Sequence, residues 1–531
     1  MSLVNPRDTL LVAGGSVTVQ NQKLHRWFNV LANETDISQS EFELDTNGRE
    51  IFRDTHSLMY AIGSGHAGRT YLVRRGNSLF EAPLSYYSTP AKWDLSPGYE
   101  SGEVGFSRRV DEACLTCHTG RVQLVLASEG NSSEQNGADF SVSCENCHGP
   151  GQQHVKERSA GIPILNRLRR AQPGVRSVQE SGDTSIVNPR RLQEWLADNI
   201  CMSCHEASST RVLRPGKSFS DFRPGLPLDE TAVIFAIRSS QEASRSMPLQ
   251  HYTSMVASQC YQASRGKLGC LSCHDPHSEP VDPASYFRQK CLACHADADC
   301  RLSLEVRQAR VPANDCAGCH MPKRGLREIS HSTLTDHRIV VRSDEPYPAD
   351  AIAQSGTVFG SLVHVNAIPG QPDQVPAVTL LEAYSALVPE NPSLEGDYNL
   401  ALDRAATTNP NSASVLSKLG WRCYKHDTPD ARIRAIAYFQ GSIARDSKSA
   451  ADYSALGDLL LKSGRSEEAL VVLRKGIALD QYYPRSYKLL ALCYIALGQY
   501  KEALDAMRQA LDVFPEDSSM RNLLRRAQLP Q

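Results

Sequence analysis

The clearest pattern of apolar and polar residues lies in the last third of the chain, where it repeats every 34 residues. Small residues alternate with large apolar ones in the spacing of helix pairs that stack into a solenoid. We therefore predict stacked helix pairs over 376–531, with three clear pairs and a degenerate fourth in 376–408. The residues that recur are Tyr453 and Tyr487, Leu456 and Leu490, Gly464 and Gly498, and Ala469 and Ala503.

The first part of the chain, residues 1–110, has short runs in which apolar and polar residues alternate. The runs lie in 16–52 and 71–87 and are interrupted by the turn pairs Asn47-Gly48 and Gly76-Asn77. Alternation with a period of two is typical of strands with one buried face. We expect a small part with β-hairpins here, within a fold class that is mainly α.

The middle, residues 111–340, has few long apolar runs, and a proline-containing segment follows it at 341–375. That segment has no clear periodicity, so we interpret it as a linker. No stretch of apolar residues reaches the length of about 18 needed to cross a bilayer. The apolar patch near the start, Leu10 to Ala13, is too short for a secretory signal.

Cysteine is the residue type that changes this picture. The 531 residues include 16 cysteines, and most of them form six Cys-x-x-Cys pairs, each followed at once by histidine. We number these motifs one to six in chain order. They are Cys114, Cys117 and His118; Cys144, Cys147 and His148; Cys201, Cys204 and His205; Cys270, Cys273 and His274; Cys291, Cys294 and His295; and Cys316, Cys319 and His320.

A zinc ribbon or a dithiol redox pair also uses Cys-x-x-Cys, but neither requires histidine at the next position. Histidine supplies only 16 of the 531 residues. Six chance matches would therefore occur on the order of once in a billion. The motifs predict six covalently attached c-type haems, with two thioether bonds to each haem and the histidine as proximal iron ligand. The haems would supply much of the core that this region lacks.

A low-spin haem also needs a second axial ligand on its other face, usually histidine or methionine. Residues 1–340 contain eight histidines outside the motifs, which is enough for six irons. His277 lies too near His274 to reach the opposite face of the same iron, so it would serve a neighbouring haem. We favour His66, His154, His277, His331 and His337 as second ligands over His25, His56 and His251.

Several segments resemble multihaem c-type cytochromes. They are IGSGHAGRTYL at 62–72, SCENCHGPG at 143–151, LSCHDPHS at 271–278, DCAGCHMPK at 315–323 and TDHRI at 335–339. The resemblance is to the tetrahaem cytochrome c-554 type, a group related to hydroxylamine oxidoreductase and pentahaem nitrite reductase, of which one bacterial branch ends in tetratricopeptide repeats. The C-terminal repeats resemble tetratricopeptide repeats separately.

The resemblance leaves three functions open. The chain lacks the Cys-x-x-Cys-Lys motif of the nitrite reductases, and no tyrosine is assignable to the haem cross-link of hydroxylamine oxidoreductase. Both departures favour an electron carrier over a redox enzyme that acts on a small nitrogen or sulfur compound at one open haem. A scaffold, in which the repeats dock a redox partner protein, is compatible with the carrier.

The remaining cysteines and a group of arginines have structural alternatives. We consider a disulfide between Cys260 and Cys300, and we interpret Cys423 and Cys493 as buried thiols of the repeats. The arginines form either a solvated basic face or partners for haem propionates. They are Arg167, Arg169, Arg170, Arg176, Arg190 and Arg191.

Net charge and compartment complete the expectations. The formal net charge of −2 gives no reason to propose nucleic acid as a partner. Covalent haems and many cysteines favour a periplasmic or extracellular location, with an export signal that was removed or lies upstream. The expected partners are redox proteins that dock on the repeats.

Overall fold

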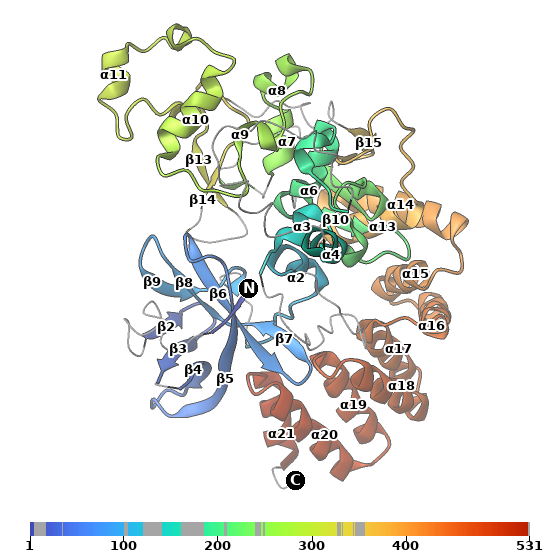
Figure 1. Cartoon of the computed structure of the whole chain (residues 1–531). Coiled ribbons are helices and arrows are strands. Elements are labelled where there is room, and N and C mark those ends of the chain that lie inside the picture. The colour runs from blue at the N-terminus through green and yellow to red at the C-terminus, as the bar shows by residue number, and fades with distance from the viewer. Residues whose placement is uncertain are drawn as a thin grey trace.

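The computed structural model describes residues 1–4, 17–33, 35–99, 105–120, 141–160, 185–206, 210–238, 246–247, 250–326, 331, 333–342, 345 and 356–528. Figure 1 shows an N-terminal sheet, a middle part that carries the motifs, and C-terminal helix pairs that curve back towards the sheet. Among the described residues, no helix combines the length and the apolar character needed to cross a membrane. The polar loop 132–137 and Arg167, Arg169, Arg170 and Arg176 lie outside the described residues.

The N-terminal part is an antiparallel sheet, as the alternating pattern predicts. Its strands are β1 (Ser2–Leu3), β2 (Val17–Asn21), β3 (Arg26–Ala32), β4 (Ile37–Leu44), β5 (Glu50–Ile62), β6 (Gly68–Arg75), β7 (Ser78–Glu81), β8 (Leu84–Tyr87) and β9 (Lys92–Leu95). Strand order is β2-β3-β4-β5-β6-β8-β9, with β1 on β5 and β7 on β6. Phe28 and Val30 of β3 point inward to a shared core with Tyr71 and Trp93.

The middle part consists of short helices and small sheets. Its helices are α2 (Glu112–His118), α3 (Cys144–His148), α4 (Gln152–Ala160), α6 (Glu194–His205), α7 (His251–Val256), α8 (Gln259–Ser264), α9 (Cys270–Cys273), α10 (Pro283–Leu292), α11 (Leu304–Gln308) and α12 (Cys316–His320). Single 3-10 turns are η2 (Pro189–Arg191), η3 (Phe219–Asp221), η4 (Leu228–Glu230) and η5 (Asp297–Asp299). Its strands are β10 (Thr210–Leu213), β11 (Ala232–Ile237), β12 (Ser246–Met247), β13 (Lys323–Leu326) and β14 (Thr333–Thr335).

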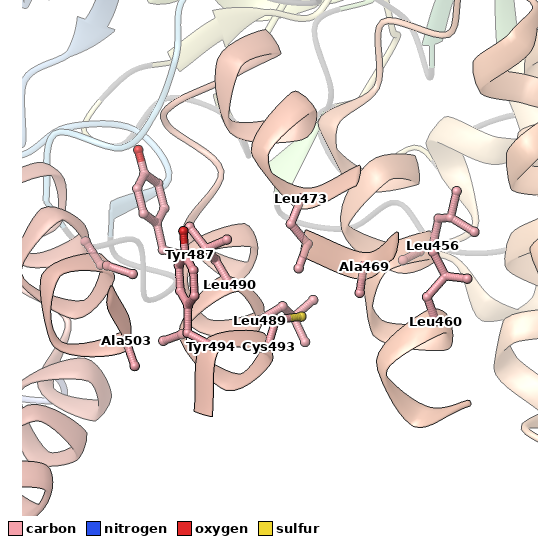
Figure 2. Close-up of a cluster of buried hydrophobic side chains, with 14 of the residues drawn as sticks. Leu456, Leu460, Ala469, Leu473, Tyr487, Leu489, Leu490, Cys493, Tyr494 and Ala503 are labelled. Atoms are coloured by element: carbon pink, nitrogen blue, oxygen red, sulfur yellow. The ribbon is translucent and has the colours of Figure 1, made fainter. Parts of the chain in front are cut away.

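The C-terminal part is a stack of antiparallel helix pairs. They are α13 (Ala377–Leu387) with α14 (Glu395–Thr408), α15 (Ala413–His426) with α16 (Pro429–Ala444), α17 (Ala450–Lys462) with α18 (Ser466–Leu479), and α19 (Pro484–Ala496) with α20 (Tyr500–Val513), followed by α21 (Ser518–Gln528); η6 (Pro392–Leu394) precedes α14. One apolar core runs through the later pairs. Figure 2 shows Cys493 inside this core beside Leu489 and Tyr494, whereas Cys423 is only partly buried.

Glycine marks the place where the helices of a pair cross. A Cβ on Gly457 of α17 would lie 2.6 Å from the side chain of Leu473 on α18. A Cβ on Gly420 of α15 would lie 2.8 Å from the ring of Phe439 on α16. These pairs need a small residue because the helices approach each other too closely for any side chain.

The stack begins on a second sheet and ends on the first. Residues 357–364, which the sequence places in a linker, form β15 (Thr357–Phe359) and β16 (Leu362–His364) in a sheet of order β10-β11-β16-β15. At the other end, Arg109 donates hydrogen bonds of 2.7 and 3.2 Å to Asp480. The ring of Tyr482 packs against Phe80 of β7, with centroids 4.9 Å apart. The repeats thus contact the second sheet at their start and the N-terminal sheet near their end.

A buried histidine joins the second sheet to the segment before the repeats. His364 is fully buried, and its Nδ1 lies 2.9 Å from both carboxylate oxygens of Asp373. Its Nε2 lies 3.1 Å from Asp229, which also pairs with Arg214 at 2.6 Å. Burial lowers the pKa of His364, but the hydrogen bond to Asp229 and the charges of both aspartates outweigh burial and raise this pKa above its ordinary value.

Replacing Gly457 by alanine is expected to lower the free energy of unfolding by about 1–3 kcal/mol, because the added Cβ overlaps Leu473. The matched control is Gly396→Ala on α14, where nothing lies within 4 Å of the added atom. That variant should gain about 0.5–1 kcal/mol from helix propensity. Urea unfolding followed by circular dichroism measures both, and equal effects would contradict the close crossing.

Replacing His364 by glutamine is expected to destabilise the second sheet in a pH-dependent way. The raised pKa means that the charged histidine stabilises the fold fully below about pH 6.5, and that this contribution is lost as pH rises through the folded pKa. The loss of stability of the second sheet in the variant, relative to the unaltered protein, should therefore be smaller at alkaline pH. Native-state hydrogen exchange of the β11 amides at two pH values measures it. A deficit that does not change with pH would argue against a charged His364.

Candidate functional site

Each of the six motifs lies on a helix or at the end of one, and the side chains of neighbouring polar residues cap several of these helices. Asp111 accepts a hydrogen bond from the backbone of Cys114 at 3.0 Å, and Asp315 accepts one from Gly318 at 2.9 Å. Two thiols three residues apart on such a helix lie on one face. The motifs therefore present both thiols in the same direction, as two thioether bonds to one haem require.

Backbone carbonyls orient the imidazoles of two motifs. Nδ1 of His148 lies 2.7 Å from the carbonyl oxygen of Val187, and Nδ1 of His320 lies 2.8 Å from that of Val340. A carbonyl can only accept, so Nδ1 carries the proton and donates. This leaves the lone pair of Nε2 for a metal ion, which is the usual arrangement of metal-binding histidine.

Two of the expected second ligands face a motif histidine. The rings of His148 and His277 are 5.9 Å apart, and those of His274 and His337 are 6.2 Å apart, between centroids. Two imidazoles that each bind one metal from opposite sides at about 2.0 Å have centroids roughly 6.3 Å apart. His277 is thus brought to motif two, and not to its own motif four, as the sequence spacing predicts.

A third pair involves a histidine that we ranked lower. The rings of His205 and His251 are 5.3 Å apart, and His251 also lies 5.0 Å from His337. Nδ1 atoms of His251 and His337 donate to the carbonyls of His205 and Thr335, each at 2.8 Å. Burial, together with the neighbouring imidazoles of His337 and His205, lowers the pKa of His251 to about 4. The cluster is therefore neutral, which is the form that binds iron.

The other candidate ligands lie elsewhere. His66 is exposed in the turn between β5 and β6, and His154 is on α4. His331 has its Nε2 3.1 Å from Asp94 and its ring against Tyr87. In the N-terminal sheet, His25 is in the turn before β3, and the Nε2 of His56 lies 2.9 Å from Asp54.

Thiols of different motifs lie beside one another. A hydrogen bond with Cys204 lowers the pKa of Cys117, and one with Cys270 lowers that of Cys201, in both cases against the effect of burial. The structure has no disulfide between Cys260 and Cys300, the pair that we considered. Cys260 is instead placed among Cys273, Cys291 and Cys294.

Three carboxylates that the sequence analysis did not single out hold this arrangement in place. Glu206 is fully buried and accepts a hydrogen bond from the backbone of Tyr252 at 2.7 Å, which anchors the helix of His251 beside motif three. Asp336 is buried and binds Arg338 at 2.8 Å, which fixes the turn of His337. Asp198 accepts from the backbone of Cys270. Glu206 follows His205 and Asp336 precedes His337 in the sequence. This neighbourhood is the one sequence feature that could have identified these carboxylates.

The last three motifs lie in a region without an apolar core of its own. Among the described residues of 257–342, Val340 is the one buried apolar side chain. Val281 and Val311 are fully exposed. The partly exposed thiols and the paired imidazoles of this region fit large apolar haem groups, which would bury the surface that the protein leaves open. Arg190 and Arg191 are exposed beside motif two, as a solvated face or propionate partners would be.

Known proteins match both the predicted repeats and the predicted multihaem cytochrome. Residues 460–527 match the tetratricopeptide repeat family. The multiheme cytochrome MtrA of Shewanella baltica (strain OS185) is 22% identical over 270 residues, 49% of this chain and 69% of the relative. The resemblance to a multihaem cytochrome with tetratricopeptide repeats is thereby confirmed.

Two further proteins are similar to part of the chain. Anaphase-promoting complex subunit 7 of Arabidopsis thaliana is 35% identical over 95 residues, 18% of this chain, and the chain spans only 17% of that relative. The solved Arabidopsis OM64 TPR domain is 20% identical with a TM-score of 0.21, covering 22% of this chain and 93% of that domain.

The missing apolar core leads to a prediction for haem-free protein. Without haem, residues 257–342 should be cleaved by protease first, because few buried contacts resist local opening there. The N-terminal sheet and the repeats have cores of their own and serve as internal controls. Limited proteolysis with mass spectrometry of haem-free and haem-loaded protein measures this. Equal resistance of all three regions in the haem-free chain would contradict it.

Proposed function

We propose that the chain is an electron-transfer c-type cytochrome with six covalently attached haems, one at each motif, and a repeat region that docks redox partner proteins. The observation that carries the proposal is the pairing of motif histidines with second histidines at the spacing of one iron, in a region that lacks its own core. The similarity to a multihaem cytochrome supports it independently.

The axial ligands follow from the ring pairs. We assign His277 to the iron of motif two, His337 to that of motif four and His251 to that of motif three. His66, His154 and His331 remain the candidates for the other three irons. When bound, each haem supplies a one-electron Fe(III)/Fe(II) couple. Carbonyl hydrogen bonds of the chain orient the imidazoles of His148 and His337, so that Nε2 of each is left for the metal ion.

The repeats have free surface for a partner in their central pairs. The turn at Asp480 and Tyr482 already contacts the N-terminal sheet. Helices α15 to α18 lie between this contact and the second sheet, and stacked pairs of this kind generally bind other proteins. We further propose that the protein works outside the cytoplasm, where exported c-type cytochromes acquire haem.

A redox enzyme is the second candidate, and one observation favours it. The His295 side chain of motif five is 58% exposed, and its Nδ1 lies 3.8 Å from Asp299, a contact too long for a hydrogen bond. A haem at this motif would be within reach of small solutes. An iron there without a second protein ligand would accept a small nitrogen or sulfur compound.

Haem quantification and low-temperature EPR of the oxidised protein test the proposal. We expect six haems per chain by pyridine haemochrome, all low-spin. Replacing His337 by alanine should leave the haem count unchanged and convert one haem to high spin, because the motif-four iron loses an axial ligand. The matched control is His426→Ala, at an exposed position on α15.

The outcomes separate the two candidates. Fewer than six haems would overturn the count, and an unchanged spectrum of the His337 variant would overturn its assignment as a ligand. A high-spin haem in the unaltered protein that shifts on addition of nitrite or hydroxylamine would move the enzyme ahead of the carrier.

A further inference from the structure

The helices that carry the motifs contact one another in an order that differs from their order in the sequence. Motif three lies on α6, which packs against α2 of motif one, α3 of motif two and α9 of motif four. Helix α9 packs in turn against α10 of motif five, and α10 against α12 of motif six. Figure 1 shows α9 between α6 and α10.

The positions of the thiols on these helices agree with the order of the helix contacts. Cys204 of motif three is hydrogen-bonded to Cys117 of motif one, although motif two lies between them in the sequence. Cys201, on the same helix, is hydrogen-bonded to Cys270 of motif four. Motif one therefore meets motif three directly, and motif three meets motif four.

Motif four contacts motifs two and three on one side and motif five on the other. The backbone of Cys270 donates to Asp198 of α6 at 2.8 Å, which ties the start of α9 to motif three. The ring of His277, just beyond the motif, lies 5.9 Å from that of His148 of motif two, between centroids. In the other direction, Cys273 lies close to Cys294 of motif five. Cys291 of motif five lies close to Cys316 of motif six.

We infer that the six sites form a branched chain in which the haem of motif four is the junction between a group of three, at motifs one to three, and a pair, at motifs five and six. The inference rests on the proposed electron-transfer function. An electron from an external donor that reduces Fe(III) at motif six would pass through motif four, with each iron reoxidised as its neighbour is reduced, and leave from the group of three to an external acceptor. A chain in sequence order would instead connect motif one only through motif two.

Removal of single haems distinguishes these arrangements. A ruthenium trisbipyridine photosensitiser is attached to Ala309→Cys, at the exposed end of α11 near motif six, with ascorbate as sacrificial donor. Cys260, Cys300 and Cys423 are changed to serine in all variants to prevent other labelling. Transient absorption of dilute protein counts the haems that are reduced in the fast, intramolecular phase.

Two variants with five haems each are compared. In Cys270→Ser/Cys273→Ser, which lacks the junction, only the haems of motifs five and six should be reduced in the fast phase. In the matched variant Cys144→Ser/Cys147→Ser, which lacks motif two, all five remaining haems should be reduced in the fast phase, because motif one reaches motif three directly. Pyridine haemochrome verifies the haem content of each variant.

Each outcome has a definite meaning. If more than two haems are reduced in the fast phase of the variant that lacks motif four, motif four is not the junction. If the haem of motif one is not reduced in the fast phase of the variant that lacks motif two, motif one does not reach motif three directly and the chain of haems is not branched. Failure of the unaltered chain to load haem would instead refute the proposed function. If the double-serine variant does not fold, His274→Met keeps the thioether bonds but raises the potential of that haem. It should slow reduction of the group of three at least tenfold, whereas His148→Met should leave motifs one and three unaffected.

Discussion

The arrangement of this protein depends on apolar surface that the polypeptide does not provide. Residues 257–342 are too polar and too short in helix to bury a core, and the described part of this segment buries a single apolar side chain, Val340. The motifs there present thiols and imidazoles in the places where a fold would ordinarily have leucine or phenylalanine. Covalent attachment of an apolar group at each motif would supply both the missing burial and the rigidity that positions the irons.

The rest of the chain forms a frame around that region. The N-terminal sheet and the repeats each have a conventional core, and they meet at the aromatic pair of Phe80 and Tyr482 and at polar contacts. Arg26 of β3 donates to the backbone carbonyl of Glu516 at 3.0 Å. Burial and the nearby charge of Glu516 raise the pKa of Glu41 to about 8, although Arg26 acts in the opposite direction. Such contacts are specific, because each buried group depends on its partner.

This closure limits what the repeats can do. A free solenoid offers its whole inner face to a partner, but here its first pair rests on the second sheet and its last pairs rest on the first. His364 fixes the first of these contacts and Arg109 the second. The repeats therefore have a structural role at both ends of the stack, which leaves the central helix pairs for the docking role that we propose.

The sequence by itself determined the features that depend on local spacing. The six motifs and the hairpins of the N-terminal part follow from spacings of a few residues, and the helix pairs follow from the 34-residue repeat. The separation of His277 from the iron of its own motif follows from its closeness to His274 in the sequence. Tertiary structure alone decided which motifs are neighbours, that His251 lies beside His205, and that residues 357–364 are strands. These depend on contacts between residues far apart in the chain, whose pairing is set by packing of whole elements and leaves no periodic trace in the sequence.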